Sequence, residues 1–282
     1  MRPSLDVSAA DAYCWRLACR HYENFSVTAW ILRRALRRDL ARLYAYCRTT
    51  DDLGDEHGGS ARAHLERWRD EVRELFAGGR PVHPVLVALG ETVAEHALPA
   101  EPFLDLIEAN LQDQAVSRYD TWPELHAYCM KSAAPVGRVV LRLFRMYSPL
   151  SEPRSDDVCI GLQLANFAQD VRVDAGKGRT YLLQTDVERE GIAGATRSLC
   201  ERARQLLASG RELEAMAPWP LRPQLALYRL GGLAIVDAIE QQGYRTDHQR
   251  PQVSAWAKLL VFQRAIRQSL QEGGDARKLG TA

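Results

Sequence analysis

The chain has 282 residues, of which 46% are hydrophobic and 26% are charged, and its formal net charge at pH 7 is +1. This near-neutral charge excludes a global electrostatic field that would recruit nucleic acid or an anionic membrane to the whole surface. Charged residues interrupt every apolar run before it reaches the roughly 18 residues of a membrane-spanning helix, so we expect no transmembrane segment.

The cysteines and the first residues of the chain bear on its compartment. The six cysteines never form a C-x-x-C pair and lie among residues with a helical pattern, where a free cysteine behaves as a small buried hydrophobe. The first 20 residues carry charges throughout and contain no apolar run of the kind found in signal peptides. We therefore expect a cytoplasmic protein with reduced thiols.

Helical periodicity dominates the chain from end to end. Leucines recur every three or four positions in 32–53, with arginines on the opposite face, and 61–78 repeats this pattern. Further helices are expected near 100–117, 122–147, 156–175, 196–217, 222–246 and 253–271, with proline and glycine at the joints. We find no period-2 strand, no solenoid repeat and no Ser/Gly-rich linker. The sequence therefore predicts one all-α domain over residues 1–272, followed by a polar tail over residues 273–282.

An acidic pair lies near the end of the first of these helices. Asp51 and Asp55 are four residues apart, so both carboxylates project from one helix face. Such a pair destabilises an isolated helix by roughly 0.2–0.5 kcal/mol, which favours the interpretation that a cation binds between them. Arg48 lies on the same ridge and could offset the repulsion or bind a phosphate. The alternative, a charged helix end running into a glycine turn, is disfavoured by the helix dipole.

A second acidic pair belongs to a longer polar stripe. Four polar side chains follow a 3–4–4 spacing on one predicted helix face: Gln163, Asn166, Asp170 and Asp174. A basic loop with two glycines comes next, and its Lys177 and Arg179 could close over a phosphate. The alternative interpretation is a surface helix with salt bridges and an ordinary glycine stop.

The two acidic faces together predict a metal-dependent phosphate site. Hard divalent cations take oxygen ligands, and Mg²⁺ is usually held by one or two carboxylates together with substrate phosphates. We therefore expect the two faces to meet across a helical cavity and to bind a phosphorylated substrate through Mg²⁺.

Four motifs in order resemble the squalene/phytoene synthase family of trans-isoprenyl diphosphate synthases, from His21 to about Leu260. They are His21-Tyr22-Glu23-Asn24-Phe25, then Arg48-x-x-Asp51-Asp52-x-x-Asp55-Glu56, then Tyr128-Cys129 with Val136-Gly137, and finally Gln163-x-x-Asn166-x-x-x-Asp170-x-x-x-Asp174 with Gly178-Arg179-x-Tyr181-Leu182.

The resemblance implies an all-α isoprenoid synthase fold in a single domain, with a central apolar cavity and Mg²⁺ ions at its mouth. The implied metal ligands are Asp51, Asp55, Asn166, Asp170 and Asp174, and the four aspartates among them are the implied catalytic residues. The implied substrate-binding residues are His21, Phe25, Arg48, Gln163, Asn166, Lys177 and Arg179. The implied partner is an isoprenoid diphosphate, whose leaving group the metals and cations stabilise.

Two departures from the family pattern bear on the reaction. Lys131 stands where condensing relatives carry a tyrosine that is implicated in joining two prenyl diphosphates, and Gln169 stands where they usually carry an arginine. Three motifs together resemble the hydroxysqualene synthases of bacterial hopanoid pathways, namely His21-Tyr22-Glu23-Asn24-Phe25, Ser132-Ala133-x-Pro135-Val136-Gly137-Arg138 and Asn166-Phe167-x-Gln169-Asp170. The resemblance then implies ionisation of presqualene diphosphate, rearrangement of the cation and capture of water.

Other interpretations stay open at this point. The chain could be a presqualene diphosphate, squalene or phytoene synthase that condenses two prenyl diphosphates, or a non-catalytic helical assembly or scaffold protein. A head-to-tail prenyltransferase is disfavoured because the second motif is not Asp-Asp-x-x-Asp. Any membrane contact is expected to be peripheral, at the inner face of the membrane. Residues 253–262 are a candidate for that contact, although packing as a terminal core helix is the favoured interpretation. Other enzymes of the same pathway are candidate protein partners.

Overall fold

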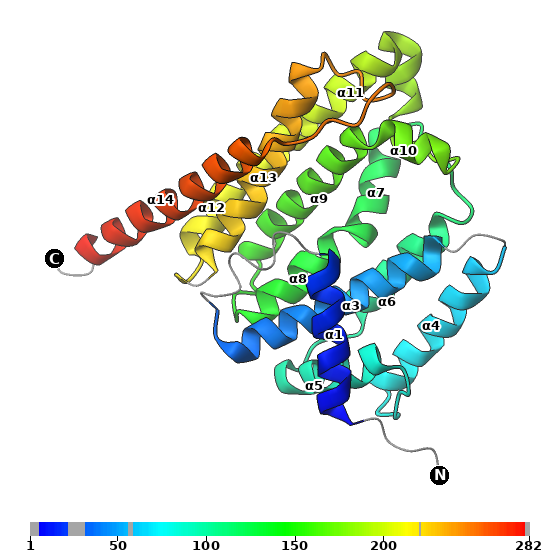
Figure 1. Cartoon of the computed structure of the whole chain (residues 1–282), viewed down its shortest axis with the longest axis vertical. Coiled ribbons are helices and arrows are strands. Elements are labelled where there is room, and N and C mark those ends of the chain that lie inside the picture. The colour runs from blue at the N-terminus through cyan, green and yellow to red at the C-terminus, as the bar shows by residue number, and fades with distance from the viewer. Residues whose placement is uncertain (1–5, 22–31, 56–58, 220, 280–282) are drawn as a thin grey trace. The chain divides into compact units, whose positions relative to one another are not determined.

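The computed structural model describes residues 6–21, 32–55, 59–219 and 221–279, and within these ranges the regular elements are helices (Figure 1). The described residues form two compact units, which we treat separately. The first unit comprises residues up to 115 together with 138–145, and the second comprises 116–137 together with the residues from 146 onward. Only one isolated β-bridge, between Tyr119 and Leu183, occurs in the described part of the chain.

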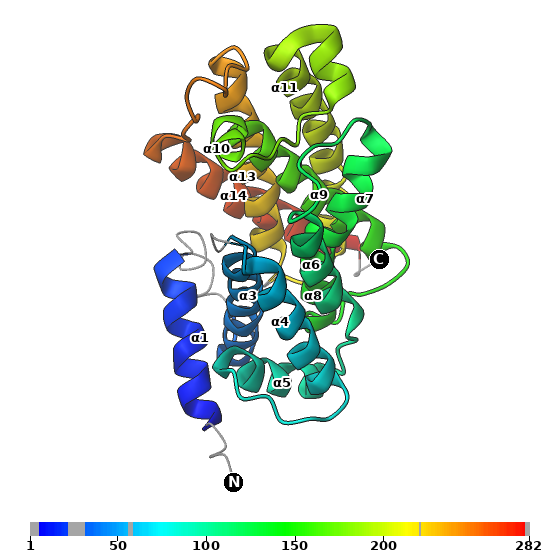
Figure 2. The ribbon, with the colours of Figure 1, turned by 90° about the vertical axis from the view of Figure 1, so that its right-hand side faces the viewer.

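The first unit is built around helix α3. Its helices are α1 (Val7–His21), α3 (Arg34–Asp55), α4 (Ala61–Phe76), α5 (Pro84–His96) and α6 (Glu101–Gln112). Helix α3 contacts each of the other four, and Figure 2 shows it between α1 and α4. Its position follows from its sequence, because apolar residues recur at helical spacing and give it a face that must be buried.

Aromatic side chains fix α3 against α4 and α6. The Tyr46 ring is fully buried, stacks on Trp68 at 5.9 Å and meets Phe103 edge-on at 5.2 Å. Both polar atoms of this cluster are satisfied, since the Tyr46 hydroxyl donates to the Phe103 carbonyl at 2.8 Å and the Trp68 indole donates to Thr50 Oγ1 at 3.0 Å. Because buried aromatic pairs prefer defined geometries, this cluster specifies how the end of α3 that carries the first acidic pair is held.

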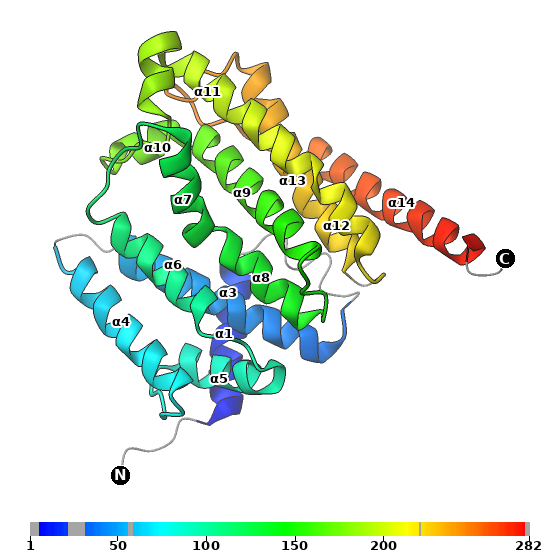
Figure 3. The ribbon, with the colours of Figure 1, turned by 180° about the vertical axis from the view of Figure 1, so that it is seen from behind.

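The second unit is built around helix α9. Its helices are α7 (Trp122–Ser132), α9 (Ser151–Gln169), α10 (Val171–Gly176), α11 (Gln184–Ala208), α12 (Gly210–Met216), α13 (Arg222–Gln241) and α14 (Ala255–Leu279). Helix α9 contacts α7, α10, α11, α12 and α13, and Figure 3 shows it running between α7 and α13. Helix α8 (Ala134–Leu143) begins in the second unit and continues into the first.

Gly137 explains one of the motifs. A Cβ atom at this position would lie 2.4 Å from Ser155 Oγ and 2.6 Å from Cys159 Sγ on α9. No real Cβ makes contacts that short, so only glycine allows α8 to approach α9 this closely. The Val136-Gly137 step is therefore required for packing within the second unit.

A buried ion pair joins three helices of the second unit. Glu214 on α12 and Arg229 on α13 are 1% and 3% exposed, and the guanidinium donates to both carboxylate oxygens, at 2.5 and 3.0 Å. The same guanidinium donates to Gln268 Oε1 on α14 at 3.0 Å. The pair is therefore fully hydrogen-bonded, which is the condition under which a buried charge is tolerated.

The all-α class predicted from sequence is confirmed. Helices α1 and α5 lie outside the predicted ranges. For α5 we took proline as a joint between helices, whereas Pro84 occupies the first turn of the helix, where its missing N–H costs nothing. The predicted helix over 122–147 is divided at Ala133, and the one over 156–175 at Asp170. No helix among the described residues is long and apolar enough to cross a membrane. The domain boundaries 1–272 and 273–282 stay a prediction.

Removing one member of the Glu214–Arg229 pair should be far more damaging than removing both. Glu214→Leu or Arg229→Met leaves a buried charge without its partner, and we expect each to lower the free energy of unfolding by about 3–5 kcal/mol. The double variant should lose much less than the sum, because no charge is left buried. Urea unfolding followed by circular dichroism measures all three. Single variants within about 1 kcal/mol of the parent protein would contradict this account.

Candidate active site

The predicted site residues fall into two groups, one in each unit. Helix α3 carries Arg48, Asp51 and Asp55, whereas the region from α9 to the loop after α10 carries Gln163, Asn166, Asp170, Asp174, Lys177 and Arg179. His21 is the last residue of α1, and its side chain lies outside the described set. Phe25 also lies outside the described residues. We therefore build the two groups one at a time.

The first acidic pair lies in the last two turns of α3. Asp51, Asp52 and Asp55 are all exposed, so the charged end of the helix is open to solvent. The Arg48 guanidinium reaches Asp52, with Nη2 at 2.6 Å from Oδ1, and this i,i+4 pair leaves Asp51 to other partners. The Nε of Arg48 is buried and has no hydrogen-bond partner in the described part of the chain. This N–H group is therefore a buried donor left unsatisfied beside the first acidic pair.

Asn110 is a site residue that the sequence analysis missed. Its Nδ2 donates to Asp51 Oδ1 at 3.3 Å from the neighbouring helix α6. The approach requires Gly54, because a Cβ there would lie 2.4 Å from the Asn110 side-chain oxygen. Gln114, one turn further on, donates to the Gly54 carbonyl at 3.0 Å. The sequence does show that Asn110 and Gln114 are four residues apart and would lie on one helix face. Nothing in the sequence indicates that this face contacts α3.

The environment of Asp51 favours a neutral carboxyl or a bound cation. Although the side chain keeps contact with solvent, desolvation by the surrounding protein raises the pKa of Asp51 to about 6. The hydrogen bond from Asn110 and the charge of Arg48 act against this shift, and the charges of Asp55 and Asp52 add to it. A carboxylate with too little positive charge around it is stabilised by a nearby cation.

The second acidic face does not lie on one continuous helix. Asp170 has non-helical dihedral angles (φ −101°, ψ 16°) and separates α9 from α10. The backbone spacing survives the break, since the Asp170 amide bonds to the Asn166 carbonyl at 2.9 Å and the Asp174 amide bonds to the Asp170 carbonyl at 2.8 Å. Asp170 and Asp174 are half-buried, as is Gln163, whereas Asn166 is exposed. The prediction of one continuous stripe is therefore wrong at its third member, where the helix is interrupted.

An arginine from a distant part of the chain occupies the Asp170 carboxylate. Arg250, in the segment between α13 and α14, donates from Nε to Asp170 Oδ1 and from Nη2 to Oδ2 at 3.2 Å. The bond to Asp170 raises the pKa of Arg250 above its ordinary value. This forked geometry is the one in which arginine binds carboxylates and phosphates most strongly. Sequence analysis missed Arg250 because no local pattern links it to a residue 80 positions earlier.

Gln169 fixes the position of Arg250. It is buried, its Oε1 accepts from Arg250 Nη2 at 3.2 Å, and its Nε2 donates to the Pro251 carbonyl at 2.8 Å. Arg172 holds the same segment from the other side by donating to the His248 carbonyl at 2.6 Å. Gln169 is thus both acceptor and donor for one short stretch of chain, which a glutamine amide can be and a guanidinium cannot.

The basic loop is anchored by aromatic packing. After α10, the amides of Lys177 and Arg179 both bond to the Asp174 carbonyl at 2.9 Å, and Gly178 adopts φ +73°, a left-handed conformation suited to glycine. Tyr181 follows and stacks on Phe167 of α9 at 3.8 Å with an interplanar angle of 7°. Tyr119 and Tyr128 complete a buried four-ring cluster. The predicted loop is therefore hydrogen-bonded to the Asp174 carbonyl where it starts, and Tyr181 returns the chain to the core.

The predicted metal ligands fit Mg²⁺ in their chemistry. Four carboxylates and the amide oxygen of Asn166 are the hard oxygen donors that this ion prefers. A different group is the one compact cluster of potential ligands among the described residues, namely Asp39, Glu95 and His96. Asp39 there accepts from Thr92 at 2.8 Å and lies 3.5 Å from the buried Arg42 guanidinium, so it balances an internal charge. The ligand roles of the four aspartates stay a prediction.

Lys131 is exposed near the end of α7, on the turn before the break at Ala133. The buried Tyr128 and Cys129 precede it, so the lysine is the solvent-facing member of this motif. The structure therefore presents a cationic side chain at the position where the family pattern has a tyrosine.

Comparison with known proteins identifies the family. The sequence model described as squalene/phytoene synthase matches residues 18–257. The phytoene synthase of Arthrospira platensis is 29% identical over 90% of this chain and 92% of its own length. The 15-cis-phytoene synthase of Synechococcus elongatus is 30% identical over 92% of this chain and 94% of its own length.

Solved structures agree with this result. The squalene synthase HpnC from Alicyclobacillus acidocaldarius is 42% identical and superimposes with a TM-score of 0.79 over 84% of this chain and 95% of its own. A dehydrosqualene synthase in complex with a ligand, at 21% identity, shares the fold with a TM-score of 0.83 over 93% and 97% of the two chains. With its ordered motifs on a matching all-α fold, this chain belongs to the squalene/phytoene synthase family, whose enzymes act on prenyl diphosphates.

Proposed function

We propose that the protein is a hydroxysqualene synthase. It takes presqualene diphosphate and breaks the carbon–oxygen bond to the diphosphate, which leaves with the electron pair. The cyclopropylcarbinyl cation that remains rearranges, and a water molecule adds through its oxygen and loses a proton. The products are hydroxysqualene, diphosphate and a proton, so the reaction consumes no reductant.

The observation that carries this proposal is the pair of bonds made by Gln169. Condensing relatives usually have an arginine at this position, according to the family pattern described above. An arginine here could not accept the hydrogen bond from Arg250 and would put two like charges side by side next to Asp170. The site of this chain is therefore built around a glutamine. Lys131, which replaces the tyrosine implicated in condensation, also supports the proposal.

Sequence identity also supports the proposal. The chain is 42% identical to the solved structure described as squalene synthase HpnC, but 31% identical to phytoene synthase 3 of Zea mays and 28% identical to phytoene synthase 1 of Arabidopsis thaliana. Identity across the whole chain cannot by itself specify a reaction, so the local arrangement at Gln169 carries more weight.

We assign the roles of the chain's residues as follows. Asp51 and Asp55 of the first unit, and Asn166, Asp170 and Asp174 of the second, would hold Mg²⁺. When bound, these ions would neutralise the diphosphate and favour its departure. Arg48, Lys177 and Arg179 are assigned to binding of the diphosphate on the family pattern. Arg250, which pairs with Asp170, is a further candidate cation. Gln163, His21 and Phe25 are assigned to substrate binding on the family pattern.

A condensing synthase is the second candidate. Phytoene synthases are prominent among the relatives of similar length, and both acidic motifs required for diphosphate ionisation are present. A condensing enzyme uses the same aspartates, so the choice between the two reactions depends on residues such as Lys131 and Gln169. We further propose a cytoplasmic enzyme that meets the inner face of the membrane peripherally and exchanges substrate and product with other enzymes of its pathway.

The substrate is tested directly with purified protein, Mg²⁺ and no NADPH. We expect presqualene diphosphate to be converted to an alcohol that carries one ¹⁸O atom when the reaction is run in H₂¹⁸O, as measured by mass spectrometry. Farnesyl diphosphate or geranylgeranyl diphosphate alone should give no product. Condensation of either one would contradict the proposal and support the second candidate.

Loss of a proposed metal ligand should abolish activity without unfolding the protein. We expect Asp51→Asn and Asp170→Asn each to lower kcat/KM on the order of 10²-fold or more, because charge developing on the leaving group loses its stabilisation. Asp52→Asn is the matched control, since it removes an exposed carboxylate that pairs with Arg48, and such pairs contribute little. Equal losses in Asp51→Asn and Asp52→Asn would contradict the assignment of Asp51.

The positioning role of Gln169 gives a separate test. Gln169→Met keeps the size of the side chain but loses both hydrogen bonds, and we expect kcat/KM to fall about tenfold or more, with a higher Mg²⁺ concentration needed for half-maximal activity. Arg172→Gln is the control, because it loosens the same segment without touching Arg250. If Arg172→Gln were as damaging as Gln169→Met, general anchoring of the segment would explain both results.

A further inference from the structure

Helix α14 exposes four large apolar side chains, whereas its Val261, Phe262 and Ile266 are half-buried. Trp256, Leu259, Leu260 and Leu270 are 67%, 44%, 36% and 58% exposed. At 100° per residue, all four fall on one side of the helix, within about a quarter of its circumference. We call these four residues the apolar face of α14.

The opposite side of α14 carries small residues. Among the residues of this helix whose side chains the structure describes, Ala265 and Ser269 are the fully buried ones, and they lie nearly opposite Trp256. In an ordinary amphipathic helix the large apolar residues would occupy that inner side. A cluster of large exposed apolar side chains on one face marks an interaction surface.

The charge on this part of the chain is entirely positive. Between Pro251 and Leu270 there is no aspartate or glutamate, whereas Lys258, Arg264 and Arg267 are present. In the part of the chain whose side chains the structure describes, no carboxylate pairs with Arg264 or Arg267. The nearby acidic residues of α13, Asp237 and Glu240, both pair with Arg204, at 2.7 and 2.5 Å, so these three side chains together carry one net negative charge.

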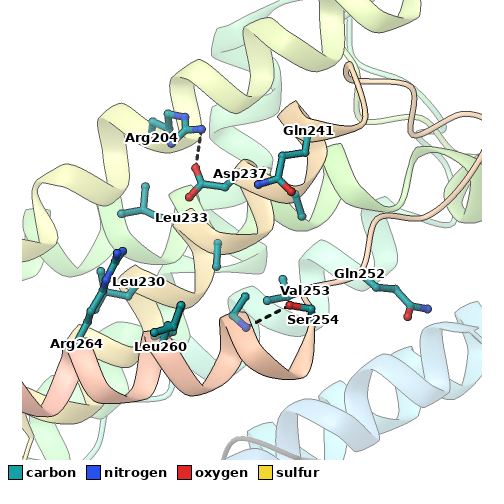
Figure 4. A pocket seen from close by; sticks show the side chains of 14 residues that line it. Arg204, Leu230, Leu233, Asp237, Gln241, Gln252, Val253, Ser254, Leu260 and Arg264 are labelled. Atoms are coloured by element: carbon teal, nitrogen blue, oxygen red, sulfur yellow. Dashed lines mark hydrogen bonds and ion pairs between the residues drawn. The ribbon is translucent and has the colours of Figure 1, made fainter.

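Two adjoining hollows lie beside the apolar face. The first, about 330 Å³, lies between α13 and α14 and has Leu230, Leu233, Leu260 and Arg264 in its wall, as Figure 4 shows. The second, about 410 Å³, shares two of these leucines and is rimmed by Arg211, Arg264 and Arg267, with the neutralised Arg229 among its lining residues. An apolar groove thus continues into a basic one.

We propose that α13 and α14 form a docking surface for anionic phospholipid. The apolar face of α14 lies at the boundary between headgroups and acyl chains, the first hollow accepts hydrocarbon, and Arg211, Arg264 and Arg267 bind phosphates. Trp and Leu beside Lys and Arg, with no acidic residue between Pro251 and Leu270, is the composition by which a helix lies in a membrane interface.

The charge pattern favours lipid over a second copy of the chain. A two-fold interface through this surface would bring each copy's arginines against the same region of the other copy. An anionic leaflet supplies the opposite charge instead. The docking surface is argued from the residues of α13 and α14 alone. Only the reason why this enzyme would need a membrane rests on the proposed function, whose product is a long isoprenoid alcohol that is poorly soluble in water.

The experiment is co-sedimentation of the full chain with vesicles. We compare vesicles of phosphatidylglycerol and phosphatidylcholine in about a 3:7 ratio with vesicles of phosphatidylcholine alone. The parent protein should bind the anionic vesicles and release them as salt is raised. Trp256→Ser/Leu259→Ser and Arg264→Glu/Arg267→Glu should each weaken this binding by more than about tenfold.

Matched controls remove the same kinds of side chain elsewhere. Arg62→Glu/Arg73→Glu reverses two arginines of α4 that are 63% and 54% exposed, and Val82→Ser/Leu150→Ser removes two apolar residues that are 49% and 69% exposed. Both should bind vesicles as the parent does. Circular dichroism checks that every variant is folded.

The outcomes separate docking from catalysis. Loss of binding in the two α14 variants alone, with turnover of presqualene diphosphate in detergent unchanged, supports the proposal. Binding that survives in both α14 variants overturns it, whatever the enzyme's activity. A dimer in light scattering that Trp256→Ser/Leu259→Ser dissociates would also overturn it, because the face would then be a contact between copies. Vesicle binding without turnover would contradict the proposed function and leave the docking surface standing.

Discussion

Repulsion between carboxylates spaced one helical turn apart is the constraint on which the candidate site depends. In each acidic group, different hydrogen-bond donors offset this repulsion. In the first unit, Arg48 pairs with Asp52 while Asn110 reaches Asp51 across Gly54, and in the second, Arg250 occupies Asp170. In the first unit, desolvation and, to a smaller extent, the charges of Asp55 and Asp52 still raise the pKa of Asp51 to about 6. A pair of carboxylates held near neutral amides is a suitable binding site for a hard cation.

The interruption of the helix at Asp170 determines where the candidate site residues of the second unit lie. Asp170 leaves the helical conformation, so its carboxylate meets Arg250, and Gln169 just before it turns inward to hold the segment that carries this arginine. The basic loop beyond α10 returns to the core through the stack of Tyr181 on Phe167. Rigid aromatic and amide contacts therefore support the charged groups, and this is how a site keeps its geometry when a ligand binds.

Packing within the second unit also explains why α14 has an unusual surface. The helix is tied to the core through Gln268, which joins the buried Glu214–Arg229 pair, and through the small residues Ala265 and Ser269. With these positions used for packing, its tryptophan and leucines remain outside. The favoured sequence-based interpretation, a terminal core helix, therefore holds for one side of α14 and not for the other.

The sequence by itself determined the helical class and the composition of both acidic groups, because a period of 3.6 residues and the spacing of Asp51 with Asp55 and of Asp170 with Asp174 are local properties. It also identified Gln169 as unusual, without indicating its partners. Only the tertiary structure decided that Asn110 and Arg250 join these groups and that α9 ends at Gln169. The physical reason is that hydrogen bonds between residues about 60 to 80 positions apart depend on how helices pack, and packing leaves no periodic trace in the chain.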